Sequence, residues 1–269
     1  LSKLKIDFVL ATNSPRAERA ALLAAKELGI PSCCVNDNLW IKGGAKQVAE
    51  LNCTDAICVI GEAVKNDLLN NTEFPSDKIF VTGTPVFDSL KAFKTGSNNR
   101  KDNVLSVLLA DCDLPERHPL YPGTLANSEF GQHVRVELNR LAKTKGWKVT
   151  FRKHPTQKVD YRPYEYISES QSQEDLHHLL QQVDVVVTAI STVGFEGKVL
   201  GKGLVSLEGT VFRAAGSYAT LGLSTGVLAA QELEMAIKLE TNASNAQGFK
   251  LYQGTSLRNI ESVIEELLS

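Results

Sequence analysis

The sequence predicts an α/β protein made of two units, each with a parallel sheet covered by helices on both faces. Short apolar runs rich in β-branched residues alternate with helical patterns along the chain, which is the order of elements in parallel sheets. The polar stretch KAFKTGSNNRKDN at residues 91–103 interrupts this alternation and has the composition of a linker. The chain has 269 residues, of which 43% are hydrophobic, so its length allows one large domain or two of moderate size.

The first third of the chain contains the signals of four strands and two helices. Ser14 is suited to cap a helix, and Pro15 suits the first helical position. Gly29 should end this helix, and a second helix is expected over 62–69, followed later by a turn over 82–85. The apolar face of the first helix is predicted to consist of Ala17, Ala20, Ala21, Ala24 and Leu28. The expected strands are 7–11, 32–35, 56–60 and 78–81.

The rest of the chain repeats this pattern. An apolar stripe at helical spacing is formed by Phe130, Val134, Leu138, Leu141 and Ala142, and another by Leu257, Ile260, Ile264, Leu267 and Leu268. Further helices are expected over 175–181, 194–200 and 232–239, and strands over 104–110, 148–152, 183–187 and 204–207. We therefore predict an N-terminal domain over 1–92, a C-terminal domain over 103–255 and a final helix over 256–269.

Composition excludes several classes of protein. The net charge of −2 gives no electrostatic basis for binding nucleic acid, and no apolar run is long enough to span a membrane. The five cysteines fit no zinc spacing, which indicates reduced thiols and a cytoplasmic location. The chain does not begin with Met and enters a strand almost at once, so we expect that an upstream segment has been left out.

The stretch Val183–Leu207 is the most informative part of the sequence. A short β-branched run leads into the hydroxyl-rich residues 188–192, then into a helical segment that Gly201 ends, and then into a second strand. Free backbone N–H groups at such a helix start attract anions, phosphate above all. Ser191 and Thr192 could equally serve only as helix caps.

Other polar loops are expected at the same edges of the sheets, because ligands of open α/β sheets bind beyond the carboxyl ends of the strands. These loops contain Thr12–Ser14, Asn36–Asp37, Asp111–His118, His154 and Ser191–Thr192. His118, His177 and His178 are interpreted as polar surface positions.

Three stretches resemble the two-Rossmann-domain (GT-B) sugar-nucleotide enzymes, which include bacterial polysaccharide glycosyltransferases and UDP-N-acetylglucosamine 2-epimerases. IFVTGTPVFDSL at 79–90 is similar to the segment that closes the family's N-terminal domain. Arg152-Lys153-His154-Pro155 is similar to the "HP" turn of the transferases. AISTVGFE at 189–196, followed by Gly201-Lys202, is similar to the family's nucleotide loop. The resemblance implies two facing Rossmann-like domains with parallel sheets.

The same resemblance implies roles for individual residues. The nucleotide sugar would be bound by Arg152, His154, Ser191, Thr192, Val193 and Glu196. Ser191 and Thr192 would hold the phosphates, Glu196 would accept hydrogen bonds from the ribose, and His154 would face the diphosphate or leaving group. The family needs no metal, so we expect no metal or other cofactor, although Asp111 and Asp113 form an acidic pair of the kind that Mg²⁺ or Mn²⁺ accepts.

The sequence also departs from the epimerases of this family. Those enzymes carry acids at two N-domain turns, which here read Thr12-Asn13-Ser14 and Val35-Asn36-Asp37-Asn38. Only Asp37 could serve as a catalytic base, and Asn-Asp-Asn is also ordinary turn chemistry. The N-terminal domain is short for such a fold, so we expect that a first β-α-β portion and part of the acceptor site are absent.

These observations favour a glycosyltransferase that uses a nucleotide-activated donor in the biosynthesis of cell-surface polysaccharide or lipopolysaccharide. Its acceptor would be a saccharide or a lipid-linked saccharide, which is compatible with peripheral membrane contact. The alternatives are a nucleotide-sugar epimerase and a non-catalytic protein that only binds the nucleotide sugar, since a fold does not determine chemistry.

Overall fold

The computed structural model describes residues 5–12, 17–36, 45–90, 104–110, 114, 116–117, 126–154, 164–171, 173–215, 217–242 and 255–269. The chain forms two compact units. The first consists of Leu1–Ser89 together with Phe249–Ser269, and the second is the continuous segment Leu90–Gly248. The expected linker at 91–103 lies outside the described residues.

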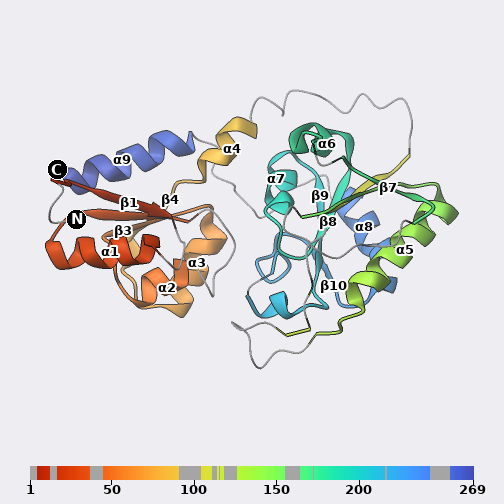
Figure 1. Ribbon diagram of the computed structural model, residues 1–269, viewed down its shortest axis with the longest axis horizontal. Helices are drawn as coiled ribbons and strands as arrows, with labels where there is room; N and C mark the ends of the chain where they lie inside the picture. Colours follow the sequence, from red (N-terminus) through yellow and green to blue (C-terminus); the bar gives the residue numbers. More distant parts are fainter. Residues whose placement is uncertain are drawn as a thin grey trace. The chain divides into compact units, whose positions relative to one another are not determined.

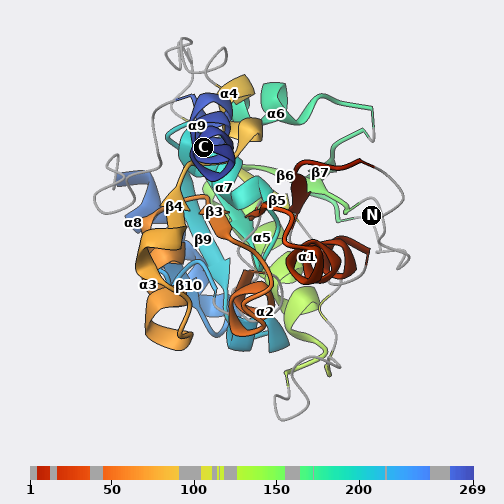
Figure 2. The same cartoon turned by 90° about the vertical axis from the view of Figure 1, so that its left-hand side faces the viewer.

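The first unit contains a four-stranded parallel sheet in the order β1-β2-β3-β4 (Figure 1). The strands are β1 (Val9–Thr12), β2 (Ser32–Val35), β3 (Ala56–Val59) and β4 (Ile79–Val81). Helices α1 (Ala17–Leu28), α2 (Ala45–Glu50) and α3 (Glu62–Asn71) cover one face, and α9 (Ser256–Leu268) covers the other (Figures 1 and 2). The remaining helix, α4, spans Pro85–Leu90.

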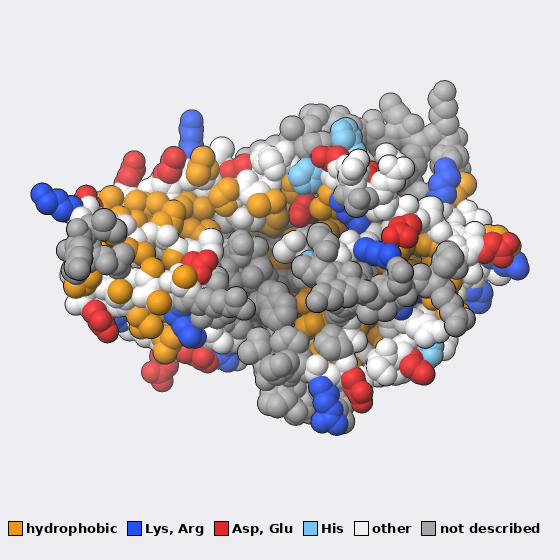
Figure 3. Space-filling model, viewed as in Figure 1, with side chains coloured by type: hydrophobic (Ala, Val, Ile, Leu, Met, Phe, Trp, Pro, Cys, Tyr) orange, Lys and Arg blue, Asp and Glu red, His pale blue; other side chains and the backbone are white. Residues whose placement is uncertain are grey.

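Helix α9 packs on the sheet through Ile260 and Val263, against β2 and β3. Their partners there are Cys33, Val35, Ala56 and Cys58. Of the predicted stripe, Leu257 and Leu268 are instead about half exposed, at 54% and 53%. Figure 3 shows hydrophobic side chains gathered over the first unit, along the region that α4 and α9 occupy in Figure 1. Helix α9 therefore exposes Leu257 and Leu268 on an outer side that also carries charged residues such as Glu261.

The start of α9 is fixed by an acid that is distant in sequence. The carboxylate of Asp88, in α4, accepts hydrogen bonds from the backbone N–H groups of Ser256 at 2.9 Å and Leu257 at 3.0 Å. Asn259 of α9 also donates to the carbonyl oxygen of Thr82 at 3.3 Å. The first N–H groups of a helix have no partner within the helix, so the Asp88 carboxylate caps α9 in place of a local residue.

The second unit contains a six-stranded sheet in the order β10-β9-β8-β5-β6-β7, with all of its pairs parallel. The strands are β5 (Ser106–Ala110), β6 (Lys148–Arg152), β7 (Ile167–Glu169), β8 (Val185–Thr188), β9 (Gly203–Leu207) and β10 (Thr225–Val227). The helices are α5 (Phe130–Lys145), α6 (Leu176–Gln182), α7 (Val193–Val199) and α8 (Leu233–Asn242). Strands β5, β8 and β9 are buried along their whole length, as their apolar runs predict.

Two glycines let helices approach this sheet closely. A Cβ atom at Gly203 would lie 2.8 Å from the carbonyl oxygen of Glu240 in α8. A Cβ atom at Gly197 in α7 would lie 2.8 Å from Val186 Cγ2 in β8. Since real Cβ atoms do not come so close to other atoms, larger residues at these positions would push α8 and α7 away from the strands.

The carboxylate of Glu240 connects α8 to three other elements. Its Oε1 accepts hydrogen bonds from the backbone N–H of Thr225 at 2.7 Å and from the Thr225 hydroxyl at 2.9 Å. Its Oε2 accepts from the Leu204 N–H and from Lys198 Nζ in α7, both at 3.2 Å. Glu240 is only 8% exposed, so this carboxylate satisfies the rule that buried charges are paired and hydrogen-bonded.

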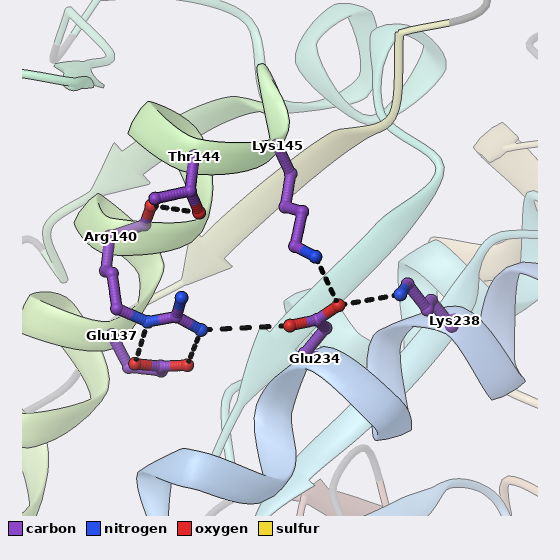
Figure 4. A network of polar contacts seen from close by, with 6 residues as sticks. All are labelled: Glu137, Arg140, Thr144, Lys145, Glu234 and Lys238. Atoms are coloured by element: carbon purple, nitrogen blue, oxygen red, sulfur yellow. Dashed lines mark hydrogen bonds and ion pairs between the residues drawn. The ribbon is translucent and has the colours of Figure 1, made fainter.

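A second polar network joins α5 and α8 at the surface (Figure 4). Arg140 donates two hydrogen bonds to Glu137, and Glu234 of α8 lies 3.7 Å from Arg140, 3.2 Å from Lys145 and 2.6 Å from Lys238. Hydrogen bonds from Lys238 and Lys145 lower the pKa of Glu234. Because its three cations are exposed to solvent, the network should weaken as salt concentration rises.

The predicted strand and helix order is confirmed, with some corrections. The α5 stripe is buried as predicted, but the buried face of α1 is formed by Leu22 and Ala25 instead of the predicted residues. The short elements α2, α4, β7 and β10 were not predicted. Cys33, Cys34, Cys53 and Cys58 are buried free thiols, while Cys112 lies outside the described residues. Among the described helices, none is long and apolar enough to cross a bilayer.

Replacing Asp88 with alanine should lower the free energy of unfolding by about 0.5–2 kcal/mol, the usual cost of losing a helix cap. The amide protons at the start of α9 should also exchange faster with solvent. Chemical denaturation and hydrogen exchange measure the two effects. Asp77→Ala, which removes an exposed acid of the same unit, is the control. Unchanged exchange at Ser256 and Leu257 in the Asp88 variant would refute the capping role.

Candidate functional site

The candidate site lies at the carboxyl ends of two strands in the second unit. Strands β8 and β6 flank β5 in the sheet, and Arg152 of β6 is paired with Ala110 of β5. Strand β6 ends at Arg152, and His154 follows two residues later. Strand β8 ends at Thr188 and leads through Ser191 and Thr192 into α7. Arg152, His154, Ser191 and Thr192 therefore lie at one edge of one sheet, where ligands of such sheets bind.

The turn between β8 and α7 is short and partly exposed. Thr192 immediately precedes α7, is exposed, and its side chain makes no capping hydrogen bond. The Ser191 hydroxyl accepts from the N–H of Val193 at a long 3.4 Å, and the Ser191 carbonyl accepts from the N–H of Gly194 at 2.9 Å. Capping therefore occupies Ser191 weakly and does not occupy the Thr192 side chain, so both hydroxyls are suited to meet a ligand.

Tyr218 holds this turn from the other side. Its hydroxyl donates to the carbonyl oxygen of Ser191 at 2.5 Å, and its ring packs edge-on against Phe195, with centroids 5.0 Å apart. A Cβ atom at Gly194 would lie 2.8 Å from the ring of Tyr218, so only glycine leaves room for it. Tyr218 is fully buried. The position of the Ser191 backbone is thus fixed by packing as well as by hydrogen bonds.

Glu196 lies one helical turn beyond Thr192 and is 9% exposed. Its Oε2 lies 3.0 Å from Nε2 of His177. Burial raises the pKa of the Glu196 carboxyl, and the hydrogen bond with His177 and the charges of His177 and Arg152 offset part of that rise. The predicted surface role of His177 is wrong, because α6 places its ring against this buried carboxylate.

Helix α6 is positioned for this contact by its own cap. Asp175 precedes the helix, and its carboxylate accepts from the N–H of His178 at 3.0 Å. That hydrogen bond is the main cause of the lowered pKa of Asp175. The cap fixes the first turn of α6, which is the turn that carries His177.

The β6 loop contributes a positive charge. Arg152 is half-buried and donates through Nη1 to the carbonyl oxygen of Glu174 at 3.0 Å. Its positive charge lowers the pKa of the Glu196 carboxyl, as a smaller contribution than that of His177. His154 is exposed at the end of the same segment. The structure thus brings Arg152, His177 and Glu196 together, while Val193 begins α7.

Three predicted residues cannot be placed. Asp37, Asp111 and Asp113 lie outside the described residues, and the proposed roles of all the site residues stay predictions. Within the part of the chain that the structure describes, no group of three or more His, Cys, Asp or Glu side chains could hold a metal ion. The hydroxyls, backbone N–H groups and cations of the site can bind an anion. The Glu196 carboxylate can accept hydrogen bonds from neutral O–H or N–H groups.

No family model matches the sequence, and no curated protein sequence matches it. The fold, however, is similar to solved structures. UDP-GlcNAc 2-epimerase of Methanocaldococcus jannaschii, in complex with UDP-GlcNAc and UDP, has a TM-score of 0.67 and 17% identity over 99% of this chain and 77% of that one. The UDP-GlcNAc 2-epimerase of Neisseria meningitidis, bound to UDP-GlcNAc, has a TM-score of 0.65. Its sequence is 18% identical over 100% of this chain and 78% of that one.

A glycosyltransferase from Rickettsia africae has a TM-score of 0.51 and 15% identity over 99% of this chain and 75% of that one. The likeness to all three proteins extends over essentially the whole chain, through both units. The chain therefore has the two-unit α/β fold of these sugar-nucleotide enzymes, as the resemblance implied.

Proposed function

We propose that the protein binds a nucleotide-activated sugar on its second unit and transfers the sugar to a saccharide or lipid-linked acceptor. The observation that carries this proposal is the buried Glu196 carboxylate, held by His177 one helical turn from the Ser191 turn. A carboxylate kept beside an anion-binding turn suits a molecule that combines a diphosphate with a ribose diol. The epimerases of similar fold, solved with UDP-GlcNAc, add support.

Each residue has a chemical role in this proposal. The hydroxyls of Ser191 and Thr192, with the N–H groups at the start of α7, bind the diphosphate. Glu196 accepts hydrogen bonds from the ribose hydroxyls, and His177 keeps its carboxylate in position. Arg152 and His154 supply positive charge or hydrogen bonds to the phosphates.

In the transfer step the acceptor hydroxyl attacks the anomeric carbon of the donor. The bond from that carbon to the diphosphate oxygen breaks, and its electron pair leaves with the nucleoside diphosphate. Groups that bind this developing negative charge lower the barrier, which is the part assigned to His154 and the Ser191 turn. The proton of the acceptor hydroxyl goes to a base, for which Asp37 is the candidate.

A nucleotide-sugar epimerase is the second candidate, favoured by the two similar folds that are epimerases. Epimerisation needs acid and base groups on the two sides of the sugar. Among the described residues at or after the strand ends of the first unit, Thr12, Asn36, Thr82 and Thr84 are neutral, and Glu62 is an exposed acid at the start of α3. This set of side chains favours transfer. A protein that only binds the nucleotide sugar is the third candidate.

Replacing Ser191 and Thr192 together with alanine should weaken nucleotide binding by about 1–3 kcal/mol, the range for lost hydrogen bonds to charged groups. Calorimetry with UDP, CDP, GDP and CMP measures the change. Thr144→Ala with Ser262→Ala, which removes two exposed hydroxyls far along the chain, should leave affinity unchanged. Equal affinities for the folded Ser191/Thr192 variant and the wild type would refute the phosphate site.

Replacing Glu196 with glutamine should weaken the binding of ribonucleotides more than the binding of their 2′,3′-dideoxy analogues. Only the ribonucleotides have the two ribose hydroxyls from which the carboxylate can accept hydrogen bonds. Calorimetric titration of each pair measures the difference. Glu129→Gln, which neutralises an acid whose side chain is 71% exposed, is the matched control. The same loss for both members of a pair would show that Glu196 serves the structure of α7 and not the ribose.

Product analysis distinguishes the three candidate functions. A transferase should release nucleotide faster with an acceptor than without one, as NMR of the reaction shows. His154→Ala should reduce turnover more than donor affinity, and His133→Ala, another exposed histidine, should change neither. Formation of the 2-epimer without an acceptor would establish the epimerase instead. No turnover with any acceptor would leave the binding-only function.

A further inference from the structure

A buried carboxylate at the end of β9 has one oxygen without a hydrogen-bond partner among the described residues. Glu208 directly follows this strand and is 7% exposed. Its Oε1 is fully buried and has no hydrogen-bond partner in the described structure. Leaving a buried acceptor unpaired is unfavourable, so such an atom indicates that a donor from outside the protein belongs there.

A hydroxyl two residues from Glu208 is in the same situation. Ser206 of β9 is fully buried. The Ser206 hydroxyl oxygen is buried and has no hydrogen-bond partner among the described residues. Ser224, which precedes the neighbouring strand β10, is level with Leu204 at the other end of the sheet and does not belong to this group. Side chains two residues apart on a strand point to the same face, so Ser206 and Glu208 point the same way.

A glycine makes room for this carboxylate. Gly226 of β10 is in register with Ser206 of β9. A Cβ atom at Gly226 would lie 2.8 Å from Glu208 Cγ and 2.8 Å from the Cβ of Ala219. Any side chain at this position would displace the glutamate or the loop that carries Ala219. The sequence thus provides a glycine where the Glu208 side chain requires one.

Glu208 and the proposed diphosphate site lie at the same edge of the sheet, after the neighbouring strands β9 and β8. Ser206 is in register with Thr188, the last residue of β8, and β8 leads to the Ser191 turn. The loop that places Ala219 over Gly226 places Tyr218, one residue earlier, on the carbonyl oxygen of Ser191. One short loop therefore contacts both the Ser191 turn and Gly226, the residue against which the Glu208 side chain lies.

We propose that Glu208, with Ser206, recognises the sugar of the bound nucleotide sugar and so determines donor specificity. This assignment rests on the proposed function. A carboxylate oxygen accepts hydrogen bonds and repels phosphate, so the ligand group beside it cannot be an anion and must carry O–H or N–H donors. The hydroxyls or acylamino N–H of a sugar meet both conditions. The terminal torsion of glutamate is broad, so a small rotation can turn its oxygen to such a donor.

Glu208→Gln tests the assignment, because it keeps the shape of the side chain and removes its charge and one acceptor. Calorimetry measures the binding of UDP and of UDP-GlcNAc. The same comparison is then made for GDP and a GDP-sugar, and for CMP and a CMP-sugar. The variant should bind the nucleotide sugar about tenfold more weakly than the wild type and the free nucleotide equally well. Ser206→Ala should shift the same ratio in the same direction. Glu129→Gln, with its exposed side chain, should leave the ratio unchanged.

Three other results would overturn the assignment. An equal loss for free nucleotide and nucleotide sugar would mean that Glu208 shapes the whole site. No loss for either, in a variant that is as stable as the wild type or more so, would mean that water occupies the pocket. If the wild-type protein binds no member of any pair, the proposed function itself fails, and the assignment fails with it. Nucleotide binding by the wild type separates the last result from the first two.

Discussion

The buried carboxylate of Glu240 is the interaction on which the arrangement of the second unit depends. It ties α8 to β9 and β10 through backbone N–H groups and to α7 through Lys198, with all four distances at or below 3.2 Å. Removing one partner of a buried ion pair typically costs about 3–5 kcal/mol, because the other charge stays buried. Lys198 lies two residues from Glu196 in α7. Its hydrogen bond to Glu240 therefore also holds the helix that carries the candidate site.

Most of the fold could be predicted from the sequence because the two sheets are parallel and buried. Strands such as β8, whose residues Val185–Thr188 are all buried, must be continuous apolar runs, and such runs are easily recognised. The edge strands β7 and β10 have three residues each, too few to show a period. The face of α1 was predicted wrongly because alanines surround that helix, and tertiary packing alone decides that Leu22 and Ala25 are buried.

The candidate site was predictable only where its residues are close in sequence. Ser191, Thr192 and Glu196 belong to one strand–turn–helix unit, so local pattern identified them together. The contact between His177 and Glu196 depends on how α6 packs beside α7, which no local pattern encodes. Tyr218 and Glu208 were missed for the same reason. Gly194 leaves space for the ring of Tyr218, and Gly226 leaves space for the side chain of Glu208. These glycines were the only hints in the sequence, and a glycine does not reveal which residue lies against it.

The capping of α9 by Asp88 has a consequence for biosynthesis. The two residues of the Ser256–Asp88 hydrogen bond are 168 positions apart, and the whole second unit is translated between them. At about 5–20 residues per second, the ribosome needs on the order of ten to thirty seconds for that distance. During this time the face of the first sheet formed by Cys33, Val35, Ala56 and Cys58 lacks its covering helix. The nascent chain therefore carries an open apolar surface that chaperones can bind, and the second unit can finish folding before the first.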